Sequence, residues 1–416
     1  MSTASTRTRD WASGERQHDR LVAGAAHPRL AELGRGSQGA RAQGRRARDH
    51  RPHRGRARLR HAPQREGCGH RRHRGRRDEV HPRQRHPQLR AAILERTERA
   101  TGVAYDQSWI TVGGGGKQVI YMAFSATLDH GDEVVIPAPY WVSYPDMVLA
   151  NDGTPVIVET SSEQRYKLTP EQLEAAITER TKWVILNAPS NPSGVVYSRA
   201  ELEALAAVIE RHPHVWVLTD EIYDEILFAD EPFVSLAESA PSIRDRVFSV
   251  NGVSKSYAMT GWRLGYGIGH PTLVGAINKL QSQVSSCPSS ISQAAAAEAL
   301  TGDQGFVRES VAAYRARRDL AVERFGAIDG LEPLVPDGAF YLYVDCAGLI
   351  GRTTPDGTVL EDDQQVTLHL LEAAGVAVIQ GSAYGTAPFF RISFATSEEV
   401  IERGAAAVDA AVRALR

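Results

Sequence analysis

The chain alternates between short apolar runs and segments of helical periodicity from residue 109 to about residue 268. The runs at 134–136, 183–186 and 215–218 are continuously apolar, as strands are when helices cover both faces of their sheet. Strands separated by helical segments favour a parallel sheet, because a parallel connection must cross over the sheet. The pattern therefore predicts an α/β fold with a mixed or parallel sheet.

Helical patterns follow this region and a smaller α/β unit closes the chain. Helices are expected at 290–300, at 306–325 with Gly326 placed to end it, from the charged group 361–363 to Leu371, and from Glu398 onward. Strands are expected around 340–344, 376–379 and 391–394. We predict a large domain over residues 91–328 and a smaller C-terminal domain over residues 329–416.

The run VSKSYAMTGWRLG at 253–265 places Lys255 between two serines, eight residues before Arg263. A lysine among small hydroxyl residues, followed by glycines that allow close backbone packing, suits an amine that forms a Schiff base with a bound aldehyde. Arginine presents a planar fork to phosphate oxygens and stays charged at any working pH. The alternative is a surface lysine in a loop before a strand.

This run resembles the cofactor-lysine segment of pyridoxal-phosphate enzymes of fold type I, specifically the class I aminotransferases. The resemblance extends from about Leu89 to the C-terminus. It implies the fold type I architecture, pyridoxal 5′-phosphate as cofactor, Lys255 as its point of attachment and Arg263 as the clamp of its phosphate. Many family members carry a serine three residues before the lysine, where this chain has Gly252. That phosphate donor stays unassigned, with Ser254 or a backbone N–H as candidates.

Asp220 ends the run VWVLTD, at the carboxyl edge of the predicted sheet, where open α/β sheets bind ligands. A pyridoxal enzyme needs an acid partner for the pyridine nitrogen, since a protonated ring is the better electron sink. We therefore expect Asp220 to be this partner. The resemblance places the family's tyrosine at Tyr223, where its phenol can reach the ring oxygen O3′. The alternative is a helix-capping aspartate followed by a core tyrosine.

Residues 111–118, TVGGGGKQ, precede a helical pattern, and this order predicts a phosphate cradle of backbone N–H groups at Gly115 and Gly116. The nucleotide P-loop pattern fails, because Gln118 stands where Ser or Thr should follow the lysine. A plain flexible turn is the alternative. In the subgroup that the chain resembles, the lysine at Lys117 lies beside the substrate and meets a distal carboxylate. Otherwise it points from a helix start into solvent.

Three further positions take roles from the resemblance. Asn191, in the proline-rich loop after the run 183–186, would donate a hydrogen bond to O3′, although NPSG alone is also typical of a turn. Trp141 would stack on the pyridine ring or else pack a helix start. Arg391, within an alternating aromatic strand, would clamp the α-carboxylate of the amino acid, with a structural salt bridge as the alternative. The family-like segment 336–341 is interpreted as the start of a strand without chemistry.

The resemblance implies an aminotransferase that moves an amino group between an L-amino acid, aspartate or glutamate first, and a 2-oxo acid. Its partners would be these small molecules and a second copy of the chain in a homodimer. Prephenate, aromatic or alanine specificity, or an elimination reaction, are alternatives that sequence distinguishes poorly. A different alternative is a pyridoxal-phosphate-binding transcription regulator with a basic N-terminal segment. Residues 1–90, however, show no amphipathic helix pair for a helix-turn-helix.

Residues 1–90 contain 24 Arg, no Lys, 8 acidic residues and 9 of the 14 His. The formal net charge of −2 therefore divides into +16 for this segment and −18 for the remaining 24 basic and 42 acidic residues. We expect disorder, because the segment cannot bury enough apolar surface. We interpret it as translated out of frame, with a nucleic-acid-binding tail or a transit peptide as alternatives. On this interpretation the family's N-terminal arm is missing, residues 91–416 still fold, and the 416-residue product is poorly active.

The remaining composition is that of a globular protein. Hydrophobic residues make up 42% of the chain, enough for a core of two domains. Cys68, Cys287 and Cys346 are scattered without metal or disulfide spacing, which fits a reducing compartment and predicts no metal site. No apolar run approaches the roughly 20 residues that span a bilayer. We expect a cytoplasmic protein without membrane or nucleic-acid partners.

Overall fold

The computed structural model describes residues 87–229 and 231–416. The predictions of disorder and of a shifted frame for residues 1–90 therefore fall almost entirely outside the described residues. The prediction of disorder is wrong for the last four of these positions, because residues 87–90 begin helix α4 (Pro87–Thr101). Leu89 is fully buried in that helix, so these residues belong to the folded protein.

Seven strands form the larger sheet: β1 (Ile110–Gly113), β2 (Glu133–Ala138), β3 (Thr154–Glu159), β4 (Thr181–Asn187), β5 (Trp216–Asp220), β6 (Val247–Gly252) and β7 (Gly265–Ile268). Their order across the sheet is β1-β7-β6-β5-β4-β2-β3. Strands β3, β2, β4, β5 and β6 pair in parallel, whereas β7 is antiparallel to both β6 and β1. The predicted mixed sheet is confirmed.

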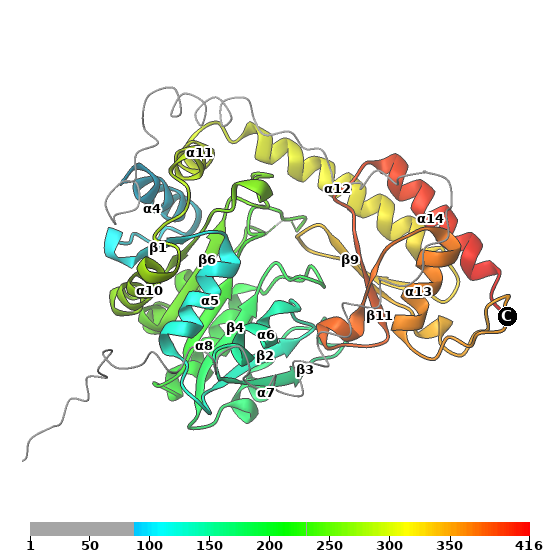
Figure 1. Cartoon of the computed structure of the whole chain (residues 1–416), viewed down its shortest axis with the longest axis horizontal. Coiled ribbons are helices and arrows are strands. Elements are labelled where there is room, and N and C mark those ends of the chain that lie inside the picture. The colour runs from blue at the N-terminus through cyan, green and yellow to red at the C-terminus, as the bar shows by residue number, and fades with distance from the viewer. Residues whose placement is uncertain (1–86, 230) are drawn as a thin grey trace, which may run out of the picture. The chain divides into compact units, whose positions relative to one another are not determined.

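Both faces of this sheet are covered, as the continuous apolar runs predicted. Val134 and Ile136 of β2 pack in one hydrophobic cluster with Phe124 of helix α5 (Gly116–Thr127). Val135 points to the opposite face and packs with Leu205 of helix α8 (Arg199–Arg211). Helix α10 (Pro271–Val284) packs against α5 and β1 (Figure 1).

Shorter elements complete this part of the chain: helices α6 (Ser143–Leu149), α7 (Pro170–Ala176), α9 (Leu236–Ser239) and α11 (Ser290–Thr301), and the 3₁₀ turns η1 (Gln107–Trp109), η2 (Pro241–Arg246) and η3 (Thr260–Trp262). Helices α4 and α11 pack together. Leu89 and Ile93 of α4 share a buried cluster with Ala295, Ala296 and Ala299 of α11. Small alanine side chains allow the two helices to approach closely.

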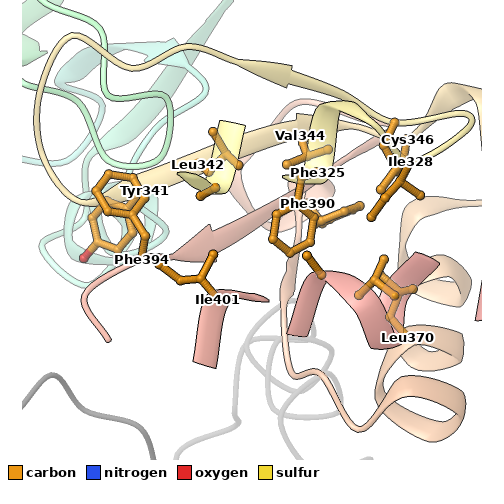
Figure 2. Close-up of a cluster of buried hydrophobic side chains, with 14 of the residues drawn as sticks. Phe325, Ile328, Tyr341, Leu342, Val344, Cys346, Leu370, Phe390, Phe394 and Ile401 are labelled. Atoms are coloured by element: carbon orange, nitrogen blue, oxygen red, sulfur yellow. The ribbon is translucent and has the colours of Figure 1, made fainter. Parts of the chain in front are cut away.

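A four-stranded antiparallel sheet with the order β10-β11-β9-β8 lies in the C-terminal part of the chain. Its region contains α12 (Gly305–Gly326), β8 (Glu332–Leu334), β9 (Tyr341–Asp345), η4 (Ala347–Leu349), α13 (Asp363–Ala374), β10 (Ile379–Gln380), η5 (Gly381–Tyr384), β11 (Phe389–Ser393) and α14 (Glu398–Arg413). Figure 2 shows the core of this region, in which Phe325 of α12, Val344 of β9, Phe390 of β11 and Leu370 of α13 are buried together.

The predicted C-terminal helices are confirmed, with α12 including Gly326 as its last residue. The strand predicted at 376–379 is wrong over most of its length, since β10 begins only at Ile379. Gly375 ends α13 in a left-handed conformation, and the Val376 N–H still bonds back to Leu370. The next residues therefore leave the helix before pairing can begin. The domain boundary at residue 328 stays a prediction.

The topology of the larger sheet gathers three strand ends that carry polar residues. Strands β4, β5 and β6 are adjacent and parallel, so their carboxyl ends lie at one edge. Asn187 ends β4 and pairs in register with Asp220, which ends β5. Strand β6 ends at Gly252, three residues before Lys255.

Candidate active site

A cavity of about 340 Å³ lies at this edge of the sheet. Nine of the ten predicted site residues line it: Gly116, Lys117, Trp141, Asn191, Asp220, Tyr223, Lys255, Arg263 and Arg391. The tenth, Gly115, lies next to the Arg263 guanidinium. Five further residues complete the lining: Tyr144, Asn187, Ile222, Ser254 and Tyr341.

Lys255 is half-buried in the turn that follows β6 and is not a surface lysine. The turn is closed by backbone bonds, including one from the Ala258 N–H to the Lys255 carbonyl at 3.0 Å. The ammonium nitrogen lies 5.4 Å from the ring centroids of both Tyr223 and Phe340. The side chain therefore projects between two aromatic rings into the cavity.

Gly252 lies where many members of the resembled family have a serine, and its surroundings leave little room for a side chain. A Cβ at this position would come within 2.9 Å of the Leu264 carbonyl oxygen and 3.0 Å of the Gly265 Cα. Both are backbone atoms of the adjacent antiparallel strand region, so a side chain there requires that backbone to move. Ser254 lines the cavity, whereas Ser256, on the other side of Lys255, is buried and does not.

Asp220 is 93% covered yet faces the cavity, and its carboxylate has specific partners. The Tyr144 hydroxyl donates to Asp220 Oδ2 at 2.7 Å, and the Ile222 N–H donates to Oδ1 at 3.4 Å. Burial raises the pKa of the Asp220 carboxyl, while these bonds and the charge of Lys255 act in the opposite direction. A cationic ring N–H in the cavity would stabilise this carboxylate further.

Tyr223 is buried, and its hydroxyl lies 2.9 Å from that of Tyr341. Burial, followed by the neighbouring Tyr341, holds the pKa of Tyr223 well above its ordinary value. The phenol is therefore a neutral hydrogen-bonding group. Tyr341 comes from the segment 336–341 that was interpreted as without chemistry, so the structure adds a cavity residue that sequence reasoning missed.

The glycine-rich turn and Arg263 form a cradle at the first residues of α5. Gly115 has φ of +98°, and a Cβ there would lie 2.4 Å from Arg263 Nη2. Arg263 has a left-handed backbone with φ of +48°, and its Nη2 donates to the Gly114 carbonyl at 3.4 Å. No carboxylate of the described residues forms a salt bridge with it. A guanidinium beside a helix N-terminus provides the donors and charge that a phosphate group requires.

Arg391 lies in β11 and forms no salt bridge with a carboxylate of the described chain. Its Nη1 donates to Asn191 Oδ1 at 2.7 Å, and its Nε is buried without a hydrogen-bond partner there. The guanidinium carbon lies 4.3 Å from the ring centroid of Tyr341 and 5.2 Å from that of Tyr384. The structural salt bridge considered from the sequence is therefore not formed. An anion in the cavity would supply the missing acceptor.

Lys117 and Trp141 meet at the mouth of the cavity. Lys117 is exposed, and its ammonium donates to Ser143 Oγ at 3.0 Å and lies 4.7 Å from the Trp141 ring centroid. Trp141 also packs edge-on against Tyr144, with centroids 5.3 Å apart. The indole therefore has both a packing role at the start of α6 and a face on the cavity.

Asn187 and Tyr144 support residues that the sequence did single out. Asn187 Nδ2 donates to the Asp220 carbonyl at 2.9 Å, and its Oδ1 accepts the Asn191 N–H at 2.8 Å. Asn187 is the last residue of β4, and a polar residue at the end of a buried strand is a sequence signal that could have identified it as a site residue. Tyr144 follows Trp141 by three residues, which places both on one side of a helical turn.

The described residues contain no helix that is long and apolar enough to cross a membrane. Among the same residues, no group of three His, Cys, Asp or Glu side chains is arranged to hold a metal ion.

Comparison with known proteins identifies the family. Residues 57–408 match the family described as aminotransferase class I and II. The chain is 50% identical over 327 residues to an aspartate aminotransferase of Rhizobium meliloti, covering 78% of this chain and 80% of the relative. It is 51% identical over 324 residues to an aspartate/prephenate aminotransferase of Cereibacter sphaeroides, covering 78% and 81%.

Solved structures agree with this match. The crystal structure of the aspartate aminotransferase from Rhizobium meliloti superposes with a TM-score of 0.85 at 41% identity and covers 100% of both chains. An aspartate aminotransferase from Thermus thermophilus, determined with maleate, has a TM-score of 0.79 at 35% identity and covers 86% of this chain and 90% of its own. The predicted fold type I architecture is confirmed. The chain belongs to the class I and II aminotransferase family.

Proposed function

We propose that this aminotransferase uses pyridoxal 5′-phosphate and acts on L-aspartate or L-glutamate with 2-oxoglutarate or oxaloacetate as acceptor. The observation that carries the proposal is the set of charges around one cavity. An amine at Lys255, a buried carboxylate at Asp220 and two guanidinium groups without carboxylate partners in the described chain, Arg263 and Arg391, share its walls. Relatives named as aspartate aminotransferases support the choice of substrate.

The residues fit this cofactor. Arg263 and the N–H groups at Gly115 and Gly116 would hold its phosphate, and Asp220 would accept a hydrogen bond from its ring nitrogen. Trp141 offers a ring face, and Asn191 and Tyr223 offer polar groups on the same cavity. When bound, pyridoxal phosphate supplies an electron sink for the pair left on the substrate Cα.

The chain's own groups would perform the remaining work. Arg391 would bind the substrate α-carboxylate through two parallel N–H donors, with Asn191 holding the guanidinium in place at 2.7 Å. Lys255 Nζ, as a free amine, would remove the proton from the substrate Cα as a general base. Fixing the α-carboxylate directs Cα toward this amine.

Lys117 would read the second carboxylate of a dicarboxylic substrate. It is a flexible ammonium that already lies over Trp141 at the cavity mouth. Lys117→Ala should lower kcat/KM for aspartate and glutamate roughly ten- to a hundredfold, as for the loss of a charge-assisted bond, while alanine and phenylalanine change by less than about threefold. Equal losses across all four substrates would contradict this role. The test compares the loss of kcat/KM between substrates, so it can be made even if the parent chain turns over slowly.

Prephenate is a second candidate acceptor, because a relative at 51% identity is named as an aspartate/prephenate aminotransferase. Prephenate also has two carboxylates, so Lys117→Ala should lower the turnover of prephenate and of oxaloacetate alike. The relatives do not favour the transcription-regulator alternative. The homodimer and the cytoplasmic location stay predictions.

A further inference from the structure

The segment that leads into β9 is fastened to the loops behind the cavity. The N–H groups of Asp337 and Gly338 both donate to the Gly194 carbonyl, at 3.0 and 2.9 Å. The Ala339 N–H donates to the Ile226 carbonyl at 2.9 Å. Gly338 passes so close that a Cβ would lie 2.7 Å from that same carbonyl oxygen. The position of Tyr341, two residues later, is therefore set by the loops that follow β4 and β5.

Tyr341 is 94% covered, and its two functional parts face different groups of the site. Its hydroxyl lies 2.9 Å from the Tyr223 hydroxyl, and the Tyr223 ring is 5.4 Å from the Lys255 ammonium. Its ring lies 4.3 Å from the Arg391 guanidinium carbon. One side chain thus contacts both the phenol beside the lysine and the arginine proposed to bind substrate.

Each contact restrains a group that has few other restraints in the described chain. In the described chain Arg391 contacts the Asn191 side chain and the rings of Tyr341 and Tyr384. The Tyr341 ring is the nearer of the two, so its face restrains the plane of the guanidinium most closely. For Tyr223 the hydroxyl bonds only with Tyr341 among the described residues. Because either oxygen can donate, Tyr341 also determines whether the Tyr223 proton is free to point into the cavity.

We propose that Tyr341 is a positioning residue with two separable functions: its ring orients Arg391 for the substrate carboxylate, and its hydroxyl orients the Tyr223 phenol toward the cofactor. This inference rests on the proposed function. It extends that function because the ring of Tyr341 would affect the affinity for substrate, while its hydroxyl would affect the pH at which the bound cofactor titrates.

Two variants of the full-length chain, loaded with pyridoxal phosphate, separate these functions. Tyr341→Phe keeps the ring, so the Kd for succinate, a dicarboxylate without an amine, should stay within about twofold of the parent value. Loss of the hydroxyl bond should shift the pH midpoint of the bound cofactor's visible absorption by roughly half a pH unit to one unit. Tyr341→Leu removes the ring, and the succinate Kd should rise roughly three- to thirtyfold.

Tyr314→Phe is the matched control. Tyr314 is a buried tyrosine that packs on Phe340, with ring centroids 5.4 Å apart, and does not line the cavity. This control should leave both succinate binding and the absorption midpoint unchanged. If it reproduces the changes, they reflect packing and the inference fails. Equal weakening of succinate binding by Tyr341→Phe and Tyr341→Leu, or no change in either, also overturns it. If the parent chain binds neither cofactor nor succinate, the proposed function fails first.

Discussion

Glu221 offers a test of the environment behind the site through the pH dependence of stability. This residue follows Asp220 and is buried, with hydrogen bonds from Thr219 Oγ1 at 2.9 Å and Ser249 Oγ at 3.4 Å. Burial, followed by the nearby Asp224 carboxylate, raises the pKa of Glu221 from its ordinary 4.5 to about 8. The folded protein should therefore hold this carboxyl protonated at neutral pH.

The direction of the pH effect follows from these two pKa values. Between pH 4.5 and about 8 the unfolded chain has lost the Glu221 proton while the folded chain keeps it, so raising the pH favours unfolding. Each pH unit between the two values is equivalent to roughly 1.4 kcal/mol, which gives about 5 kcal/mol in total. Most of this stability should be lost between about pH 5 and about pH 8, and little more above that range.

Glu221→Gln removes the titration and keeps the size and hydrogen-bonding capacity of the side chain. We expect the variant to be more stable than the parent near pH 8 and close to it near pH 5. Thermal unfolding of both chains at one scan rate measures this, and the Tm difference should grow by several degrees over that pH range. A Tm difference that is independent of pH would show that folding does not raise the pKa of Glu221 and that the carboxyl is ionised in the folded protein at neutral pH.

Two further predictions concern a buried ion pair and the phosphate cradle. The side chains of Arg96 and Asp224 form a salt bridge while only 6% and 5% exposed, so Arg96→Met should destabilise the fold by about 3–5 kcal/mol in thermal unfolding. Adding Asp224→Leu should recover most of this loss, and an undiminished loss would contradict the pairing. Gly115→Ala should push the Arg263 guanidinium aside and weaken pyridoxal phosphate binding at least about tenfold. Gly131→Ala is the control: Gly131 has φ of +91° and open space around it, so alanine there adds backbone strain without a steric clash and should leave binding unchanged.

Local sequence signals were sufficient for much of the fold and for most of the site. The apolar runs of β2, β4 and β5 predicted buried strands of a mixed or parallel sheet, and Asp220 at the end of the third run was expected at the carboxyl edge of that sheet. Lys255 and Arg263 belong to one short run, so their resemblance to a family segment was visible without a structure. Their arrangement around a common cavity follows from the strand order.

Other features depend on contacts between distant segments and could not be predicted. Tyr341 reaches the cavity only because Asp337 to Ala339 bond to loops more than one hundred residues earlier in the chain. The glycine at position 252 is explained by the close approach of the Leu264 and Gly265 backbone, which the sequence does not reveal. The two-residue strand β10 is too short to produce a pattern of its own.

The proposed attachment of the cofactor to Lys255 can be measured without turnover. The full-length chain is incubated with pyridoxal phosphate, reduced with borohydride to make the lysine linkage permanent, and mapped by peptide mass spectrometry. The chain has five lysines, so Lys117, Lys167, Lys182 and Lys279 serve as internal controls. We predict that the phosphopyridoxyl group is found on Lys255 and that Lys255→Ala abolishes the labelling. Equal labelling of another lysine, or none on Lys255 at saturating cofactor, would show that Lys255 is not the specific attachment point.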